Sequence, residues 1–143
     1  MLLCDVNVLV YAHRADTPNH DAYRSWLEKV LNGKAAYGVS DIVLSGFLRV
    51  ATHPRVFDPP SRLEDALAFA DQIRRQPNAV LLDPGERHWS IFMALCESAG
   101  VKGNLIPDAF LAALAIETGS EWITTDRDFS RFPGLNWRHP FDE

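Results

Sequence analysis

Residues 107–126 read PDAFLAALAIETGSEWITTD, and this stretch decides the fold class. Pro107 is typical of a first helical turn and Gly119 of a residue just past a helix, so a nearly all-apolar helix is predicted between them. Trp122–Thr124 follows as a short apolar run and predicts a buried strand that leads to Asp126. A buried helix that runs directly into a buried strand is typical of α/β proteins with a parallel sheet.

The same alternation extends through the rest of the chain. Further strands are predicted over three short apolar runs, Leu2–Cys4, Ala35–Val39 and Ala79–Leu82. Spacing and capping residues predict five more helical segments: Val8–Tyr11, Thr17-Pro18 to Gly33, a helix capped by Ser40 or Asp41 and ended by Pro54, the capping-box pattern Ser61-x-x-Glu64 to about Arg75, and Glu86–Ala99. The sequence therefore predicts one domain over residues 1–143, a three-layer α/β/α sandwich around a central, mostly parallel sheet of about four to five strands.

The composition fits an ordinary globular domain with an unfavourable charge for binding nucleic acid. The 143 residues are 47% hydrophobic and 23% charged, which is enough apolar material for a core. The formal net charge of −5 gives no global attraction to a polyanion and argues against a simple electrostatic nucleic-acid binder. It does not exclude a nuclease, because a divalent cation can offset acids gathered in one site.

The cysteines and the apolar runs predict a cytoplasmic protein without a membrane span. Cys4 and Cys96 lie in apolar patterns and are interpreted as core residues, not as a disulfide framework. The residues before Asp5 offer no signal-peptide core. The longest apolar run, Ala109–Ile116, is far below the roughly 20 residues that a membrane helix needs.

Three acids are predicted to meet at one edge of the sheet. Asp5 follows the first strand and Asp126 the last, so both lie at carboxyl ends, where open parallel sheets place their sites. Asp108 lies in the first turn of the helix that feeds the strand before Asp126, so the start of that helix should lie at the same edge. Carboxylates without histidine or cysteine partners suit Mg²⁺ or Mn²⁺.

Each acid also has a purely structural interpretation. Asp108 could stabilise the positive end of its helix dipole, an effect of about 0.3–1 kcal/mol. Asp126 or Asp128 could cap a short turn. Asp5 is harder to explain this way, because a charge beside buried strand residues is unfavourable without a partner.

Three motifs resemble those of PIN-domain proteins in order and spacing. They are LCDVNVL at residues 3–9, PDAFLAALA at 107–115 and ITTDRDF at 123–129. The segment FLRVATHPRVF at 47–57 is similar to one branch of the VapC toxins. The resemblance covers essentially the whole chain and implies a PIN-like sandwich.

The resemblance implies an endoribonuclease that is the toxin of a type II toxin–antitoxin pair and depends on Mg²⁺ or Mn²⁺. Asp5, Asp108 and Asp126 match the family's catalytic, metal-binding acids. Asp128 matches a less constant acid nearby, and Asn7 a supporting polar position. The implied partners are an RNA substrate, a VapB-like antitoxin in the active-site groove and a second copy of the chain in a homodimer.

Two features bear on substrate and metal binding. Arg49 and Arg127 are candidates for contacts with substrate phosphates, and Arg131 is a further one. Many PIN domains carry a Glu in the helix before the Leu-Arg segment, where this chain has Gly46. The number of metal ions therefore does not follow from the motifs.

Two other functions stay open at this stage. A PIN-like fold kept for binding a protein partner, without catalysis, would agree with Gly46 and the negative charge. A receiver-type phosphate-chemistry domain has a similar length and would use Asp83 after the third strand. It would also need a late lysine, where this chain has Thr125-Asp126.

Overall fold

The architecture was obtained as a computed structural model, which describes residues 1–142. A single parallel sheet of five strands has the order β3-β2-β1-β4-β5. Its strands are β1 (Leu2–Cys4), β2 (Tyr37–Val39), β3 (Ala79–Leu81), β4 (Glu121–Ile123) and β5 (Trp137–Arg138). The predicted α/β class and strand number are confirmed. The sequence pattern did not identify β5, because this strand is only two half-buried residues long.

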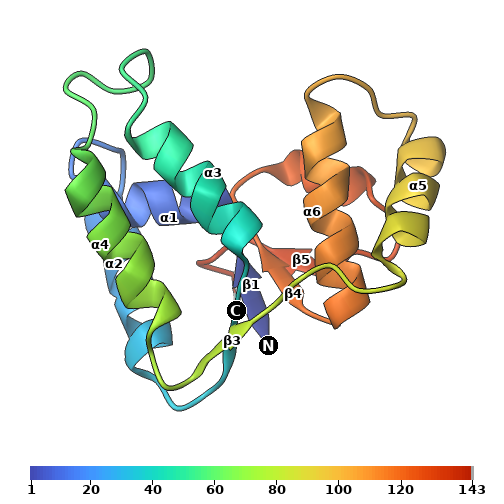
Figure 1. The fold of residues 1–143 in the computed structure, drawn as a ribbon, viewed down its shortest axis with the longest axis horizontal. Coiled ribbons are helices and arrows are strands. Elements are labelled where there is room, and N and C mark those ends of the chain that lie inside the picture. Colours follow the sequence, from blue (N-terminus) through green and yellow to red (C-terminus); the bar gives the residue numbers. More distant parts are fainter. Residues whose placement is uncertain (143) are drawn as a thin grey trace.

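Helices cover both faces of the sheet. Figure 1 shows α1 to α4 on one side and α5 and α6 on the other, which gives the three predicted layers. The helices are α1 (Val6–His13), α2 (His20–Asn32), α3 (Asp41–Ala51), α4 (Leu63–Arg74), α5 (His88–Ala99) and α6 (Leu105–Thr118), and a short 3₁₀ helix, η1 (Arg127–Arg131), follows β4.

The core includes most of helix α6 and the centre of the sheet. The α6 residues Ala109, Ala112, Ala113 and Leu114 are fully buried, and Trp122 on β4 is also fully buried. Small alanine side chains let the helix approach its neighbours closely, and Trp122 packs against Phe129 with the ring centroids 5.4 Å apart. The nearly all-apolar pattern of residues 107–119 is therefore explained by a helix that is buried on most of its surface.

The strand order creates the place where a site can form. The chain moves outward from β1 to β2 to β3, and then returns across the sheet to β4 on the other side of β1. Ligand sites in open α/β sheets lie at such a reversal, outside the carboxyl ends of the strands. Cys4 is in register with Ile123, so the residues that follow β1 and β4 leave the sheet at the same level.

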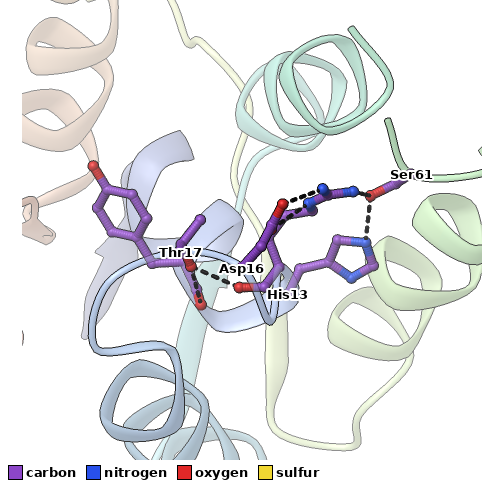
Figure 2. A network of polar contacts seen from close by, with 6 residues as sticks. His13, Asp16, Thr17 and Ser61 are labelled. Carbon is purple, nitrogen blue, oxygen red and sulfur yellow. Dashed lines mark hydrogen bonds and ion pairs between the residues drawn. The ribbon is translucent and has the colours of Figure 1, made fainter. Parts of the chain in front are cut away.

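The capping-box prediction at Ser61 is wrong. Helix α4 begins at Leu63, and its N-cap residue Arg62 makes no capping bond through its side chain. Ser61 Oγ instead lies 3.1 Å from His13 Nε2 and accepts a hydrogen bond from Arg14 Nη1 at 3.3 Å, as Figure 2 shows. Arg14 also pairs with Asp16, at 2.6 Å between Nη2 and Oδ2. The serine thus ties the end of the loop before α4 to α1, a long-range contact that no local pattern reveals.

Other predicted helix starts are displaced by two or three residues. Thr17 is not an N-cap: its hydroxyl donates to the Arg14 carbonyl at 2.6 Å, and α2 begins only after Asn19, which has a left-handed backbone with φ 59°. Helix α6 begins at Leu105, two residues before Pro107. The proline is the third residue of the helix and lies in the first turn, where backbone N–H groups have no partner within the helix, so its missing N–H costs no helical hydrogen bond. Helix α5 begins at His88 instead of Glu86.

Several local predictions are confirmed. Ser40 caps α3, with its Oγ accepting from the Ile42 amide at 3.2 Å. Cys4 is buried and Cys96 half-buried, and within residues 1–142 neither is in a disulfide. His88 is buried, with Nε2 2.9 Å from the Phe110 carbonyl. No helix in the described part of the chain is long and apolar enough to span a bilayer.

Candidate active site

Asp5 stands at the junction between the central strand β1 and helix α1. It is the N-cap of α1, with an extended backbone, and its Oδ1 accepts from the Val6 amide at 2.7 Å. Its own amide donates to the Ile123 carbonyl at 2.8 Å, which continues the pairing of β1 with β4. The side chain is only 6% exposed. The Val6 amide binds the carboxylate while the Asp5 amide is bonded to the neighbouring strand, so the position of this acid depends on the sheet itself.

Thr124 links Asp5 to Asp126. This threonine is fully buried at the end of β4. Its Oγ1 donates to Asp5 Oδ2 at 2.7 Å and accepts from the Asp126 amide at 3.0 Å. The sequence analysis did not select Thr124, although a threonine two residues before an acid at a strand's carboxyl end is a local signal for this turn.

Asp108 and Asp126 complete an acidic groove with Asp5. Asp108 projects from the first turn of α6, and Asp126 caps η1 by accepting from the Asp128 amide at 2.9 Å. The three acids line one groove of about 450 Å³. The groove is also lined by apolar residues of α3 and α6, namely Ile42, Val50, Ile106, Pro107, Phe110 and Leu111. The predicted meeting of the three acids at one sheet edge is thus what the structure has.

Two carboxyl groups of the groove, those of Asp5 and Asp108, have a raised pKa. Burial raises the pKa of Asp5 to about 6, against the opposing hydrogen bonds from Thr124 and Val6, and the charges of Asp108 and Asp126 raise it further. Burial and the charge of Asp126 also raise the pKa of Asp108. Ionised carboxylates that line one groove repel one another. A bound cation would relieve that repulsion.

The carboxylate oxygens of the groove suit a hard cation that keeps part of its water shell, and not an ion enclosed by protein ligands alone. Oxygen ligands of carboxylates are what Mg²⁺ and Mn²⁺ prefer. Within residues 1–142, however, no three His, Cys, Asp or Glu side chains lie close enough to hold one ion together. Mg²⁺ usually keeps several waters and is held by one or two carboxylates, and an open acidic groove of this kind suits that mode of binding.

The supporting residues lie around this groove to different extents. Asn7 and Arg49 line it, and both side chains are exposed. Arg127 and Asp128 are exposed on η1 and are not among the lining residues. Asp128 forms a loose ion pair with Arg131, at 3.9 Å between Oδ2 and Nη2.

Gly46 on α3 also lines the groove, and its lack of a side chain has a steric reason. A Cβ at this position would lie 2.9 Å from Cγ2 of Val6, closer than real contacts allow. Val6 occupies the space that a side chain on this turn of α3 would need. A glutamate therefore cannot simply replace Gly46 here unless Val6 moves, and this position of α3 contributes no carboxylate to the groove.

The comparison with known families agrees with this geometry. The family model described as "PIN domain" matches residues 2–135, which is nearly the whole chain. The chain belongs to the PIN-domain family. Within it, the chain is similar to curated VapC ribonucleases along its whole length. VapC ribonuclease Mb2897 of Mycobacterium bovis is 49% identical over 142 residues, 99% of this chain and 97% of that protein. Ribonuclease VapC25 of Mycobacterium tuberculosis is 41% identical over 140 residues, covering 98% and 99%.

Solved structures show the same PIN fold. The VapBC2 structure from Rickettsia felis, bound to a DNA fragment from its promoter, matches with a TM-score of 0.69 and 21% identity, covering 95% of this chain and 96% of that one. VapBC-1 from nontypeable Haemophilus influenzae matches with a TM-score of 0.64 and 17% identity, covering 97% of each. The receiver alternative has lost its basis, because Asp83 follows the edge strand β3, whereas the central strand ends at Asp5.

Proposed function

We propose that this PIN-domain protein is a Mg²⁺- or Mn²⁺-dependent endoribonuclease that acts as the toxin of a type II toxin–antitoxin pair. One observation supports this proposal most. Asp5, Asp108 and Asp126 are far apart in the sequence, yet they line one groove where the strand order reverses. Burial, and then the negative charge gathered in the groove, raise the pKa of both Asp5 and Asp108. A site of this kind favours the binding of a cation.

Asp5 and Asp108 are proposed to hold the cation, directly or through water, and Asp126 to complete its outer shell. A divalent cation bound there supplies Lewis-acid polarisation of the phosphodiester and a more acidic water for attack. Thr124 keeps the Asp5 carboxylate in one orientation through its hydrogen bond. Asn7 and Asp128 are proposed as supporting groups at the margin, and Arg49 and Arg127 as contacts for substrate phosphates.

The partners are proposed from the relatives. VapC proteins of 41–49% identity are named ribonucleases, and the structural neighbours are VapBC assemblies. We propose an RNA substrate and a VapB-like antitoxin that covers the groove. The homodimer expected from the family resemblance stays a prediction, which light scattering coupled to size-exclusion chromatography will check.

The test is cleavage of an end-labelled RNA by purified protein with Mg²⁺, with Mn²⁺ and with EDTA. We expect cleavage with either metal and none with EDTA. Asp5→Asn and Asp108→Asn should each lose at least about 100-fold in rate, of the order seen when a group that stabilises the transition state is removed. The matched control is Asp21→Asn, which neutralises an exposed acid on α2 outside the groove. Undiminished cleavage by both groove variants would show that the site assignment is wrong.

A PIN-like module that binds a partner without catalysis is the second candidate, because Gly46 leaves the groove without a fourth carboxylate. Calorimetric titration with Mn²⁺ separates the two. A catalytic site should bind the ion in wild type and more weakly in Asp108→Asn, whereas a module without a metal site should show no difference between them.

A further inference from the structure

The groove has apolar walls that the binding of a cation or a phosphate does not require. These walls belong to α3 and α6, which Figure 1 shows on opposite sides of the sheet and which line the same groove. A charged phosphate gains nothing from contact with aliphatic or aromatic side chains, because such contact only removes its water. The apolar walls therefore suit a different part of the ligand.

The first wall is a strip along α3. Ile42, Gly46 and Val50 are spaced four residues apart, so they share one face of the helix, and all three line the groove. Ile42 is 39% exposed, and Val50 is half-buried. Beside Gly46, Cγ2 of Val6 lies only 2.9 Å from where a Cβ would stand, so a methyl group of α1 fills this place. The strip is therefore apolar along its length, and Arg49 lies next to it on the same face of α3.

The second wall belongs to the first two turns of α6. Ile106 and Phe110, four residues apart, are half-buried and line the groove. His88 and Phe92 of α5 hold the Phe110 ring by T-shaped contacts, with centroids 4.3 and 5.3 Å away, so a fixed aromatic ring borders the groove. Asp108 lies between the two wall residues in the sequence but on a different side of the helix, since each helical residue turns by about 100°. One end of α6 thus offers an acid and a separate apolar surface to the same groove.

An occupant that uses the whole groove must carry an anionic group and an apolar group close together. A nucleotide has this constitution. Its phosphate suits a cation held by the acids and the guanidinium of Arg49, and its base suits the two apolar walls. Proteins bind single-stranded RNA in this way, by stacking unpaired bases on aromatic side chains. An apolar peptide side chain would cover the walls and leave the acids unused, so the combination favours a nucleotide.

We propose that the two apolar walls form a nucleobase subsite, which takes one base of the RNA beside the phosphate that is bound at the acids. Ile42 on α3 and Phe110 on α6 are the side chains that contact this base. The inference rests on the proposed ribonuclease function, and it assigns to substrate binding a part of the groove that the metal chemistry does not use.

The experiment compares nucleotides with the same phosphate lacking a base. Each of the four nucleoside 5′-monophosphates, and ribose 5-phosphate, is titrated with Mg²⁺ into protein whose isoleucine and valine methyl groups carry ¹³C. At least one nucleotide should bind about tenfold more tightly than ribose 5-phosphate, as expected when a base gains a stacking surface. It should also shift the methyl signals of Ile42 and Val50 through the ring current of the base. Ribose 5-phosphate should leave these signals nearly unchanged.

Ile42→Ser and Phe110→Leu test the two walls separately. Each should reduce the preference for the nucleotide to about twofold or less, while ribose 5-phosphate binds as it does to wild type. Ile42→Ser leaves the cap of α3 intact, because Ser40 binds the backbone amide of residue 42. The matched control is Leu67→Ser, which removes a similarly exposed apolar side chain, 45% exposed, from α4 outside the groove and should keep the wild-type preference.

Three results would overturn the subsite. The first is that no nucleotide binds more tightly than ribose 5-phosphate. The second is that both wall variants weaken the two ligands equally, because the walls would then support the fold and not a base. The third is that Ile42→Ser keeps its nucleotide affinity and escapes inhibition by a VapB-like antitoxin, since the α3 wall would then be a protein contact. The proposed function fails separately, if wild type does not cleave RNA; cleavage by wild type together with any of the three results rejects the subsite alone.

Discussion

Replacing Asp5 by asparagine should make the metal-free protein more stable at neutral pH. The carboxyl of Asp5 has a pKa of about 6 in the folded protein, raised from 3.8 chiefly by burial. The folded state therefore holds a proton that the unfolded state has released, and folding becomes less favourable as pH rises from about 4 to above 6. The asparagine side chain would be neutral throughout, so the Asp5→Asn variant escapes this penalty.

The magnitude follows from the size of the shift. Raising a pKa by about two units corresponds to about 3 kcal/mol at a pH above both values. The introduced amide can still accept a hydrogen bond through its oxygen, and losing the other bond of the carboxylate would cost about 1 kcal/mol. The net gain at pH 7.5 is then about 2 kcal/mol. At pH 4 the electrostatic part largely disappears, because the Asp5 carboxyl of wild type is close to neutral in the folded state and half-protonated in the unfolded state.

The measurement is urea denaturation of wild type and Asp5→Asn at pH 4, 5, 6 and 7.5 with EDTA present, so that no cation offsets the charge. The informative quantity is the change with pH in the difference between the two free energies of unfolding, because hydrogen bonds that do not titrate cancel from it. That difference should grow by about 2–3 kcal/mol in favour of the variant between pH 4 and 7.5. Asp21→Asn, at an exposed site, should show almost no change over the same range.

A difference that stays constant with pH would refute the reasoning, because it would mean that Asp5 titrates alike in both states. A variant that becomes relatively less stable as pH rises would refute it more strongly, since the folded pKa would then lie below 3.8. Adding Mn²⁺ should stabilise wild type and leave Asp5→Asn nearly unchanged.

Three further predictions concern the groups that shape the site. Thr124→Val removes the hydroxyl that donates to Asp5. It should lower the free energy of unfolding by about 1–3 kcal/mol. It should also move the acidic limb of the pH–rate profile to higher pH, because that hydrogen bond lowers the pKa of Asp5. Gly46→Ala should lower the free energy of unfolding measured in urea by about 1 kcal/mol or more, although alanine favours a helix. In a Val6→Ala background, which lacks the 2.9 Å contact, the same Gly46→Ala substitution should instead raise the free energy of unfolding. Ser40→Ala removes the cap of α3 and should lower the free energy of unfolding, measured by thermal denaturation, by about 1 kcal/mol. The kcat for RNA cleavage should stay unchanged, and a fall in kcat would show that α3 transmits the change to the groove.

The parts of the fold that follow from local pattern were predictable. The apolar helix before Trp122 and the short apolar strands identify the α/β class, because burial on both faces leaves no room for polar residues. Asp5 and Asp126 were placed at one edge by topology alone, since the carboxyl ends of parallel strands coincide.

The parts that depend on distant contacts were not predictable. Ser61 has a good capping sequence, but His13 and Arg14, 48 and 47 positions earlier, engage its hydroxyl instead. Thr124 gains its role from Asp5, which is 119 positions away. Side-chain bonds between distant elements leave no periodic trace, so a single sequence reveals the residue types and not their pairing.

The adjacency of β1 and β4 also has a consequence for how the protein is made. Asp5 is synthesised first, but Thr124 and Asp126 follow 119 and more residues later. At about 5–20 residues per second, translation needs roughly 6–24 s to pass from one part of the site to the other. During that interval the growing chain has no complete acidic groove, whatever the earlier helices have formed. The groove of a chain with this topology is therefore complete only after residue 126 has been made, and no reaction that depends on all three acids can begin before that point.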